Sequence, residues 1–407
     1  MNCRHCGSSL EHTFLDLGFA PPSNAYLNAS DLKRPELYFP LKIKVCNHCW
    51  LVQTEDYASA DSLFTSEYAY FSSTSRSWLK HAERYSETMI SELQLSRESF
   101  VIEIGSNDGY LLKNFVGAGI SCLGIEPTDS TADAAEKLGV PVLREFFDEA
   151  LGKQLAQKGH QADLIVGNNV YAHVPDINDF TKGLKAALKP EGTITLEFPH
   201  LLRLIKKTQV DTVYHEHFSY LSLTVVQRIF DSVGLRVFRV QELPTHGGSL
   251  RVYGCHKSDL RGTEPLVDDL IERELAFGLC ELKTYLEFQL VADQIKNNLL
   301  SFLIEQKTNQ KRVVGYGAAA KGNTLLNYTG VNADLLPVIF DAATAKQGKF
   351  MPGSHIPIVS PEQLLSETPD YVLILPWNIA DEVVNQNPLI RSRGGHFVTA
   401  VPRLEVL

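Results

Sequence analysis

The residue types best suited to chemistry stand in one short run of the chain. Tyr214, His215, Glu216 and His217 are consecutive, and they follow an apolar segment, 192–198, that is predicted to be a strand. Histidine titrates near neutrality and a neighbouring carboxylate can orient it and raise its pKa, so the run suits acid–base catalysis. Two other interpretations stay open: a His-x-His metal site, although further ligands are not obvious, and a hydrogen-bonded structural pair of histidines.

A glycine-containing turn at residues 105–109 has the character of a nucleotide site. It joins a mostly branched apolar strand, predicted at 100–104, to the start of a helix, and its small residues let backbone N–H groups approach a ligand. About twenty residues further on, Glu126 ends a second apolar strand, where a carboxylate can accept both hydroxyls of a ribose. The alternative is an ordinary α/β turn that binds nothing.

This turn resembles the S-adenosylmethionine site of class I methyltransferases more than a dinucleotide fingerprint. The strict G-x-G-x-x-G is absent, and Glu103, two residues before the turn, fits the methyltransferase form of the motif. Ligands lie at the carboxyl ends of the strands in such sheets, so residues 167–173, after the fourth predicted strand, should line the same pocket. The candidate cofactor-binding residues are Glu103, Gly105, Ser106, Asn107, Gly109, Glu126, Asn168 and Asn169.

Four of the seven cysteines form two Cys-x-x-Cys pairs near the N-terminus. Cys3 with Cys6 and Cys46 with Cys49 supply four thiolates, which is the ligand set of a closed tetrahedral zinc site. Disulfides do not persist in a reducing cytosol, so a metal accounts for the pairs better than two separate redox or packing pairs do. Because four protein ligands leave no position open for a substrate, we expect the zinc to be structural.

A second glycine-containing turn occurs towards the C-terminus. A predicted strand leads into it, Gly317, Ala318, Lys321 and Asn323 lie in the turn and the helix that follows, and Asp341 ends the next apolar strand. The pattern also satisfies a loose NAD fingerprint, in which Asp341 would bind a ribose. For Lys321 the alternative is a solvated lysine on the helix surface.

The overall composition is that of a globular protein with several domains. The chain has 407 residues and a formal net charge of −10, and its length predicts two or three domains. An acidic chain lacks the basic face of a nucleic-acid-binding protein, and no apolar run approaches the length that spans a bilayer. The N-terminus lacks the apolar region of a secretory signal. We therefore expect a cytoplasmic monomer that binds neither nucleic acid nor membranes.

The elements that must position these residues fall into four regions. Residues 1–65 form the zinc module, and 66–260 alternate strands and helices, which predicts a parallel sheet of seven strands with an antiparallel ending. Residues 261–310 have an almost continuous helical period, and 311–407 repeat the strand–turn–helix pattern. The predicted fold class is α/β: a class I S-adenosylmethionine methyltransferase sheet flanked by a zinc module and a C-terminal Rossmann-like domain.

An aromatic run, Tyr-Ala-Tyr-Phe-Ser-Ser at 68–73, precedes a long helix predicted at 77–95. Aromatic side chains before a helix often pack it against the core. The run also lies directly upstream of the first nucleotide strand, where it is placed to cover the site as a lid. Both interpretations stay open.

The chain resembles the nucleotide-sugar C-methyltransferases of branched deoxysugar pathways. Beside the cysteine pairs and the aromatic run, the resemblance rests on Tyr-His-Glu-His-Phe-Ser-Tyr at 214–220 and Gly-Tyr-Gly-Ala-Ala-Ala-Lys-Gly-Asn-Thr at 315–324, and it covers essentially the whole chain. It implies that S-adenosylmethionine methylates C3 of a 4-keto-hexose attached to a nucleoside diphosphate, usually that of thymidine.

The resemblance also implies a role for each candidate residue. His217 would remove the proton beside the ketone, Glu216 and Tyr214 would orient it or contact the sugar, and Tyr68 or Tyr70 would stabilise the developing oxyanion. Backbone N–H groups of the second turn and the helix N-terminus would hold the substrate pyrophosphate. The candidate substrate-binding residues are His215, Gly317, Ala318, Lys321 and Asn323.

Two alternatives of other classes remain. An NAD-dependent oxidoreductase acting on a nucleotide sugar would use Asp341 on a ribose, but its spacing from the turn and the presence of Lys321 favour a substrate diphosphate. A non-catalytic zinc-bearing scaffold would carry a decayed methyltransferase domain. The presence of Glu126 and His217 argues against such decay.

Overall fold

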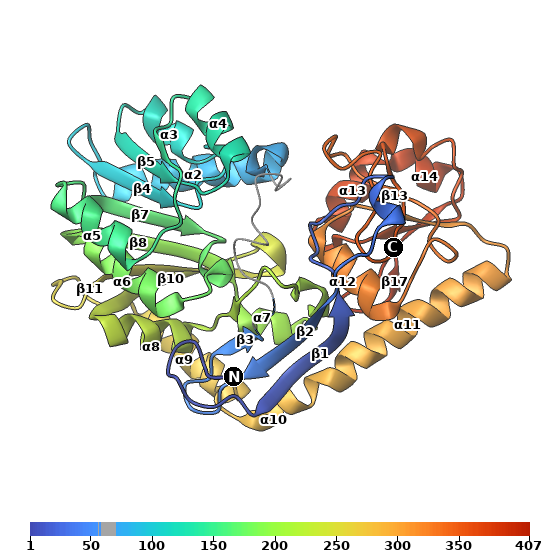
Figure 1. Cartoon of the computed structure of the whole chain (residues 1–407), viewed down its shortest axis with the longest axis horizontal. Coiled ribbons are helices and arrows are strands. Elements are labelled where there is room, and N and C mark those ends of the chain that lie inside the picture. The colour runs from blue at the N-terminus through green and yellow to red at the C-terminus, as the bar shows by residue number, and fades with distance from the viewer. Residues whose placement is uncertain (56, 58–70) are drawn as a thin grey trace.

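Three β-sheets organise the part of the chain that the structure describes, residues 1–55, 57 and 71–407. In this computed structural model, a seven-stranded and a six-stranded sheet form the centres of two α/β domains. Figure 1 shows these domains on the left and right, with the N-terminal strands (blue) and a long helix (gold) beneath both. Within the described ranges, no helix combines the length and the apolar character needed to cross a bilayer.

The seven-stranded sheet contains β4 (Phe100–Ile104), β5 (Ser121–Ile125), β6 (Val142–Leu143), β7 (Ala162–Asn168), β8 (Leu188–Pro199), β10 (Leu235–Leu243) and β11 (Ser249–His256). Its order is β10-β11-β8-β7-β4-β5-β6. Strands β4 to β8 run parallel, and β11 is antiparallel to both of its neighbours. The sequence predicts this arrangement because long apolar runs alternate with amphipathic helical segments.

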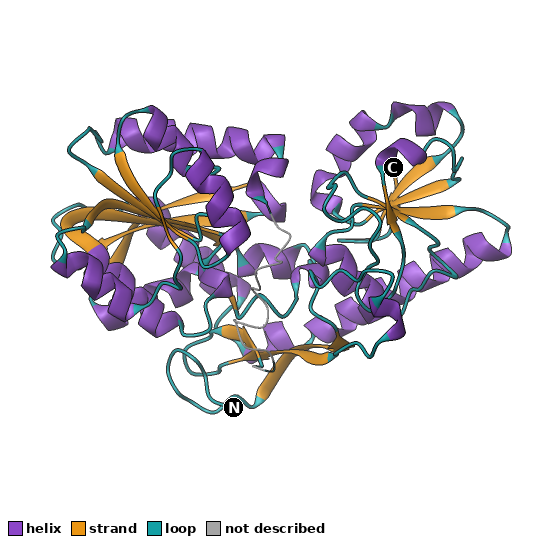
Figure 2. Cartoon of the chain, turned by 45° about the horizontal axis from the view of Figure 1, so that its top comes forward, coloured by secondary structure: helices purple, strands orange, loops and turns teal. Residues whose placement is uncertain are grey.

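Helices cover both faces of this sheet, as Figure 2 shows. Some of them begin where a side chain accepts one of the first free N–H groups: Asp148 accepts from Leu151 N, and Ser222 from Val225 N. The helices are α2 (Arg76–Glu92), α3 (Leu112–Gly117), α4 (Asp129–Lys137), α5 (Glu149–Gln157), α6 (Ile177–Ala187) and α8 (Leu223–Val233). Helix α7 (Leu201–Lys206) instead packs in the core that includes the N-terminal sheet.

The six-stranded sheet has the order β14-β13-β12-β15-β16-β17, and only β17 runs antiparallel. Its strands are β12 (Val313–Tyr316), β13 (Ile339–Phe340), β14 (Ile358–Val359), β15 (Tyr371–Ile374), β16 (His396–Thr399) and β17 (Glu405–Val406). The helices of this domain are α12 (Ala320–Thr329), α13 (Ala380–Gln386) and α14 (Pro388–Ser392). This sheet is the C-terminal α/β unit that the second glycine turn predicts.

The four-stranded sheet combines the N-terminal region with a strand from the middle of the chain. β1 (His12–Ala20), β2 (Phe39–Val45) and β3 (Val52–Thr54) pair in sequence order, and β9 (Ser219–Tyr220) adds to β3. The sequence does not predict β9, because its two residues carry no alternation. This strand follows His217 directly, so the N-terminal sheet holds the segment that carries the candidate base.

The segment between the two α/β domains consists of α9 (Pro265–Phe277), α10 (Leu282–Leu286) and α11 (Phe288–Thr308). Gly278, with φ +93°, ends α9 in the left-handed conformation that favours glycine, so the predicted continuous helix is broken there. The ring of Phe14 in β1 packs 5.5 Å from that of Tyr285 and 4.8 Å from that of Phe288. One apolar core therefore joins the N-terminal sheet, these helices and the C-terminal sheet.

Seven 3₁₀ helices connect the described elements: η1 (Asp31–Lys33), η2 (Ser72–Thr74), η3 (Tyr171–His173), η4 (Val210–Thr212), η5 (Thr245–Gly247), η6 (Pro361–Gln363) and η7 (Trp377–Ile379). Several of them stand at the carboxyl ends of strands: η3 follows β7, and η7 follows β15. The carboxyl ends of both parallel sheets face one cavity, which is where ligands bind in open α/β sheets.

Candidate active site

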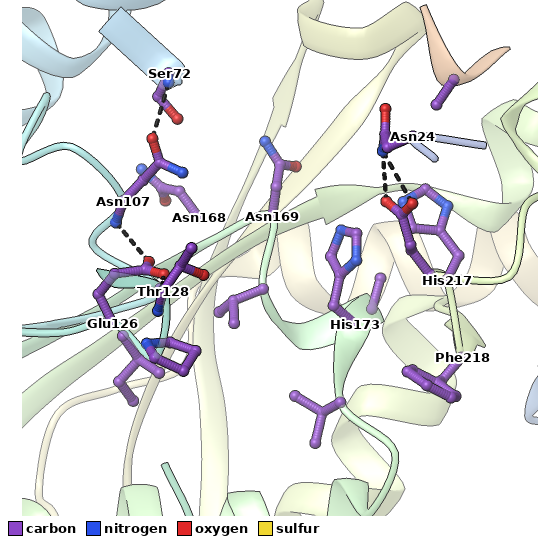
Figure 3. Close-up of a pocket in the computed structure, with 18 of the residues that line it drawn as sticks. Asn24, Ser72, Asn107, Glu126, Thr128, Asn168, Asn169, His173, His217 and Phe218 are labelled. Carbon is purple, nitrogen blue, oxygen red and sulfur yellow. Dashed lines mark hydrogen bonds between the residues drawn. The ribbon is translucent and has the colours of Figure 1, made fainter. Parts of the chain in front are cut away.

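A cavity of about 900 Å³ lies between the two α/β domains, with walls from three parts of the chain. Figure 3 shows Asn107 and Glu126 at one end, His173 and His217 at the other, and Asn168 and Asn169 between them. The second glycine turn contributes a further wall. The predicted site residues on the wall are Gly105, Asn107, Glu126, Asn168, Asn169, Tyr214, Glu216, His217 and Lys321.

The first glycine turn presents the carboxylate of Glu126 to the cavity. Gly105 adopts φ +67°, which few other residues tolerate, and turns the chain so that Asn107 N donates to Glu126 Oε2 at 2.9 Å. Thr128 N donates to the other oxygen at 3.0 Å. The side chain of Asn107 in turn accepts a hydrogen bond from Ser72 N at 2.9 Å (Figure 3). These bonds hold both residues in place before any ligand arrives.

The residues at this end fit S-adenosylmethionine. Both side-chain polar atoms of Asn168 and the Oδ1 of Asn169 are buried without a protein partner among the described residues, although buried polar atoms normally have one. The ammonium, carboxylate and ribose groups of the cofactor would supply these partners. Ile104, Ile125 and Pro127 add apolar surface to the same end of the cavity.

His217 lies at the other end, 6% exposed. Its Nδ1 is 3.0 Å from the carbonyl oxygen of Thr212. A carbonyl can only accept, so Nδ1 carries the proton and Nε2 keeps its lone pair. The ring stands 4.0 Å from that of Tyr214 and 4.7 Å from that of His173.

Burial keeps both of these imidazoles neutral. It lowers the pKa of His217 well below the usual value for histidine, and the neighbouring His173 lowers it further. Burial also lowers the pKa of His173 to about 4. A neutral imidazole at neutral pH is able to accept a proton.

The carboxylate of Glu216 is held by a residue from the N-terminal region. Asn24 Nδ2 donates to both of its oxygens, at 2.9 Å and 2.7 Å (Figure 3). Asn24 belongs to the stretch between β1 and β2, and the same stretch contacts the C-terminal domain, where Leu27 forms a bridge with Phe350. Glu216 is 2% exposed and still lies on the cavity wall, so this pair fixes its orientation there.

Lys321 places a cation on the opposite wall. Its Nζ donates to Asn378 Oδ1 at 3.1 Å and to the His246 carbonyl at 3.4 Å, and it lies 5.1 Å from the centre of the Trp377 ring. Burial lowers the pKa of this lysine, and the nearby Asp211 opposes that effect. Lys321 therefore faces the cavity and is not a solvated lysine on the helix surface.

The four N-terminal cysteines fit a zinc ion. Their sulfur atoms all lie within 4.8 Å of one another, with Cys3 Sγ 3.5 Å from Cys49 Sγ and Cys6 Sγ 3.6 Å from Cys46 Sγ. A tetrahedral site with zinc–sulfur bonds of about 2.3 Å places its sulfurs roughly 3.8 Å apart. None of these cysteines lines the cavity.

Comparison with known proteins identifies the family to which the chain belongs. Three family models match it: “Putative zinc binding domain” at residues 3–64, “Methyltransferase domain” at 77–240 and “C-methyltransferase C-terminal domain” at 244–402. The C-methyltransferase NovU of Streptomyces niveus is 33% identical over 405 residues, which cover 100% of this chain and 96% of NovU. The chain belongs to this C-methyltransferase family.

Other matches cover less of this C-methyltransferase. An uncharacterized methyltransferase of Mycobacterium leprae is 28% identical over 116 residues, 27% of this chain and 43% of its own. The solved magnesium protoporphyrin IX methyltransferase of Synechocystis PCC 6803 with bound SAH has 15% identity and a TM-score of 0.35, over 44% of this chain and 82% of its own.

Family membership confirms several predictions. The protein is an S-adenosylmethionine-dependent C-methyltransferase with a class I methyltransferase fold and an N-terminal zinc-binding module. Membership of this family favours methyl transfer over the two alternatives, an NAD-dependent oxidoreductase and a non-catalytic scaffold.

Three candidate cofactor residues do not reach the cavity of this methyltransferase. Glu103 is fully buried inside the sheet, and burial raises its pKa well above the usual value. Ser106 packs against Gly124, where a Cβ would come within 2.4 Å of the hydroxyl. Gly109 is closely packed against Ala135. These residues shape the turn from behind.

His215 also points away from the cavity. Its Nε2 lies 3.3 Å from the Phe39 carbonyl oxygen and 3.2 Å from that of Pro40, both in β2, and its ring packs edge-on against Phe39. The prediction that this residue contacts substrate is therefore not supported: residues 214–217 form a turn, closed by a hydrogen bond from His217 N to the Tyr214 carbonyl at 3.0 Å, and the contacts with β2 hold the His215 ring away from the cavity.

The backbone N–H groups of the second turn are already used within the protein. Gly317 N donates to the Phe340 carbonyl at 2.7 Å, Ala318 N to Asp341 Oδ2 at 2.7 Å, and Ala319 N to the Gly317 carbonyl at 2.9 Å. Gly317 and Ala318 therefore have no N–H group left for a pyrophosphate. Asn323 is fully buried behind the turn. The residues that this turn and its helix contribute to the cavity wall are Ala319, Ala320 and Lys321.

Tyr68 and Tyr70 lie outside the described residues. The end of the same aromatic run is described, and there Ser72 N bonds to Asn107 and Ser73 N donates to Asp108 Oδ2 at 3.0 Å. Residues 72 and 73 are thus anchored on the first glycine turn.

Asn24, His246 and Lys346 are among the wall residues that are absent from the candidates found by sequence. His246 has a positive φ of +53°, which is uncommon outside glycine, and its Nε2 lies 3.1 Å from Asn169 Nδ2. Lys346 Nζ donates to the Ala318 carbonyl at 2.8 Å. Asn24 carries no local signal. For His246, the turn 244–248 beside a strand end was the available clue.

Proposed function

We propose that this C-methyltransferase acts at C3 of a nucleoside-diphosphate-linked 4-keto-hexose, with His217 as the base. The observation that carries the proposal is that one cavity wall bears the first glycine turn, His217 and Lys321 together. A reaction that joins a methyl donor to an anionic sugar nucleotide needs these three features in one enclosed space.

The proposed first step is removal of the proton at C3. The proton passes to His217 Nε2, and the electron pair of the broken C–H bond forms an enolate whose charge rests on the C4 oxygen. The hydrogen bond from Nδ1 to Thr212 supports this role, because it fixes the tautomer with a free Nε2. S-adenosylmethionine would supply, when bound, a methyl group on a cationic sulfur; the electron pair of the enolate would form the new bond from C3 to that methyl, and the pair of the broken carbon–sulfur bond would stay on sulfur, which leaves as the neutral thioether.

Neighbouring groups are proposed to hold the sugar and the base. The carboxylate of Glu216, oriented by Asn24, is placed to accept hydrogen bonds from sugar hydroxyls. The Tyr214 ring, 4.0 Å from the His217 ring, limits the movement of the imidazole. The proposal that Tyr68 or Tyr70 donates a hydrogen bond to the enolate oxygen concerns residues outside the described ranges.

The diphosphate is proposed to lie at the start of α12. The helix has no side-chain cap, and its first residues, Ala320 and Lys321, line the cavity. A helix N-terminus attracts negative charge, and the ammonium groups of Lys321 and Lys346 on the same wall add to it. The anion would therefore bind to the side chains and the helix end, since the preceding turn has used its own N–H groups.

The test is direct methylation. The purified enzyme is incubated with S-adenosylmethionine carrying a ¹³C methyl and with a panel of nucleotide sugars that differ in the base and in having a ketone or a hydroxyl at C4. We expect the mass of one methylene to be added only to the 4-keto compounds, with the label at C3 by NMR. Methylation of 4-hydroxy sugars at equal rates would overturn the enolate step.

A further inference from the structure

Arg4 stands between Cys3 and Cys6 in the first zinc knuckle, yet its side chain extends away from the sulfur atoms. The guanidinium donates to the Pro175 carbonyl at 2.6 Å and to the Thr54 carbonyl at 3.1 Å. It also lies 5.3 Å from the centre of the Phe218 ring, within cation–π range. One side chain of the zinc module thus contacts three separate segments.

Two of these segments carry the histidines of the cavity. Pro175 comes two residues after His173, and Phe218 directly follows His217. The third segment is bonded to the second: Thr54 N donates to the Phe218 carbonyl at 3.2 Å, and the Thr54 hydroxyl donates to the His217 carbonyl at 3.3 Å. The arginine therefore connects the segment that follows His173 with the segment that follows His217. The ring centres of these two histidines are 4.7 Å apart.

The metal site in turn holds the arginine. Arg4 N donates to Gln53 Oε1 at 2.9 Å, and Gln53 Nε2 donates to Cys3 Sγ at 3.2 Å. Asn178, at the start of α6, donates to the carbonyls of Arg4 and His5 at 3.3 Å and 2.8 Å. Four metal–thiolate bonds of fixed length keep such a knuckle rigid, and hydrogen bonds around the ligands extend that rigidity outwards.

We propose that the zinc module positions the active-site histidines, and that Arg4 is the positioning residue through which it does so. The guanidinium is planar and donates in two fixed directions, so it can hold two backbone carbonyls at a set separation. A displacement of a reacting group by about 1 Å can lower a rate by roughly 100-fold. The inference rests on the proposed role of His217, and it gives the zinc module a part in catalysis beside its part in folding.

The experiment compares Arg4→Ala and Arg4→Lys with Arg228→Ala. Arg228 is a matched control: its guanidinium donates to the Cys49 carbonyl in the second knuckle at 3.0 Å, and it has no hydrogen bond to either histidine segment among the described residues. Each full-length protein is assayed for bound zinc, for the imidazole ¹⁵N resonances of His173 and His217, and for the rate of methyl transfer in a single turnover. The KM values for both substrates are measured as well.

For Arg4→Ala we expect full zinc content, shifted resonances of both histidines, a methyl-transfer rate lowered by about 100-fold, and KM values within about threefold of the unaltered enzyme. Arg4→Lys keeps the charge but loses the second donor direction, so its methyl-transfer rate should lie between that of Arg4→Ala and that of the unaltered enzyme. Arg228→Ala should change neither the resonances nor the rate.

Two results would overturn the proposal. One is an Arg4→Ala protein with full zinc whose resonances and rate match those of Arg228→Ala. The other is loss of zinc in both Arg4 variants, which would make the residue a stabiliser of the metal site. If the unaltered enzyme methylates no 4-keto sugar, the proposed substrate is wrong, and the imidazole resonances still decide whether Arg4 positions the histidines.

Discussion

The turns after β4 and after β12 hold the acidic residue of the next strand in the same way. Glu126 accepts the N–H of Asn107 at 2.9 Å, and Asp341 accepts the N–H of Ala318 at 2.7 Å. Each carboxylate also accepts the N–H of the residue two positions further along, at 3.0 Å and 2.7 Å. The two α/β domains therefore share the same pair of backbone-to-carboxylate hydrogen bonds at equivalent positions of their sheets.

The side chains around the two turns differ. Glu126 lies on the cavity wall, whereas Asp341 lies off it, 3.6 Å from the ammonium of Lys346. Lys321 and Lys346 make the wall at the second turn positive. The cavity wall from the first α/β domain bears acidic residues instead: Glu126, Glu145, Asp148, Asp176, Asp179 and Glu216.

This difference shows that two turns with the same backbone geometry need not bind the same ligand. Turn geometry sets where a ligand can approach, and the charges around it decide which ligand is attracted. We infer that the acidic end suits the cationic sulfonium of S-adenosylmethionine and that the basic end suits a diphosphate. Substitutions that affect one end alone can test this comparison.

The largest effect is expected at His217, which lies on the wall that both turns share. His217→Asn removes the proposed base, so methyl transfer should fall by about 10²- to 10⁴-fold, while the dissociation constant for S-adenosylmethionine stays within a few fold. Single-turnover rates and calorimetry measure the two quantities. Exchange of the substrate C3 proton with D₂O should fall in parallel, and unchanged exchange would remove this residue from the base role.

The second-largest effect should distinguish Glu126 from Asp341, the acidic residues held by the two turns. Glu126→Gln weakens the predicted hydrogen bond to the ribose and should raise the dissociation constant for S-adenosylmethionine by roughly 10- to 100-fold, the range for hydrogen bonds to charged groups. Asp341→Asn should leave that constant unchanged, because Asp341 lies off the wall. Equal effects of the two substitutions would mean that the turns do not have separate ligands.

A smaller effect is expected at the basic end. Lys321→Met removes a cation from the cavity wall, and the KM for the nucleotide sugar should rise by about 10-fold, with less dependence on ionic strength. Affinity for the free nucleoside diphosphate should fall by a similar factor, and S-adenosylmethionine binding should not change. A fall in cofactor affinity would assign this lysine to the other ligand.

The smallest effect concerns the histidines on the wall between the turns. Burial lowers the pKa of His173 and of His246 to about 4, below the usual 6.5. The unfolded chain therefore takes up these protons first. Stability is complete above about pH 6.5 and is lost as the pH falls towards 4, by up to about 1 kcal/mol per histidine at pH 5.5.

Denaturant unfolding of the unaltered protein and of His246→Gln, each at pH 7.5 and pH 5.5, measures this loss. The variant should lose less stability on acidification because it lacks one of the two groups. An identical loss in both proteins would show that His246 is not held neutral.

Much of the fold could be predicted from the sequence. Strand β4 has the predicted bounds, and the wall at the first turn contains Gly105, Asn107 and Glu126. These features are local: apolar periodicity defines a strand, and a glycine at a positive φ defines a turn. The paired cysteines are a local signal of the same kind.

Other parts of the site depend on residues far apart in the chain. Asn24 and Glu216 meet across 192 positions, and Asn169 and His246 across 77. β9 has two residues and pairs with β3 only because the N-terminal sheet lies beside the segment that carries His217. No periodicity or motif in the sequence reports such contacts.

The sequence by itself determined most of the strands of the first α/β domain, the two glycine turns and the cluster of four cysteines, because each of these is encoded within a few neighbouring positions. Only the tertiary structure decided which side chains share the cavity. It turned His215 away from the wall, occupied the N–H groups of Gly317 and Ala318 within the protein, and brought Asn24 to Glu216. The physical reason is that a polar group binds whichever partner packing places beside it, and packing joins three sheets from distant parts of the chain.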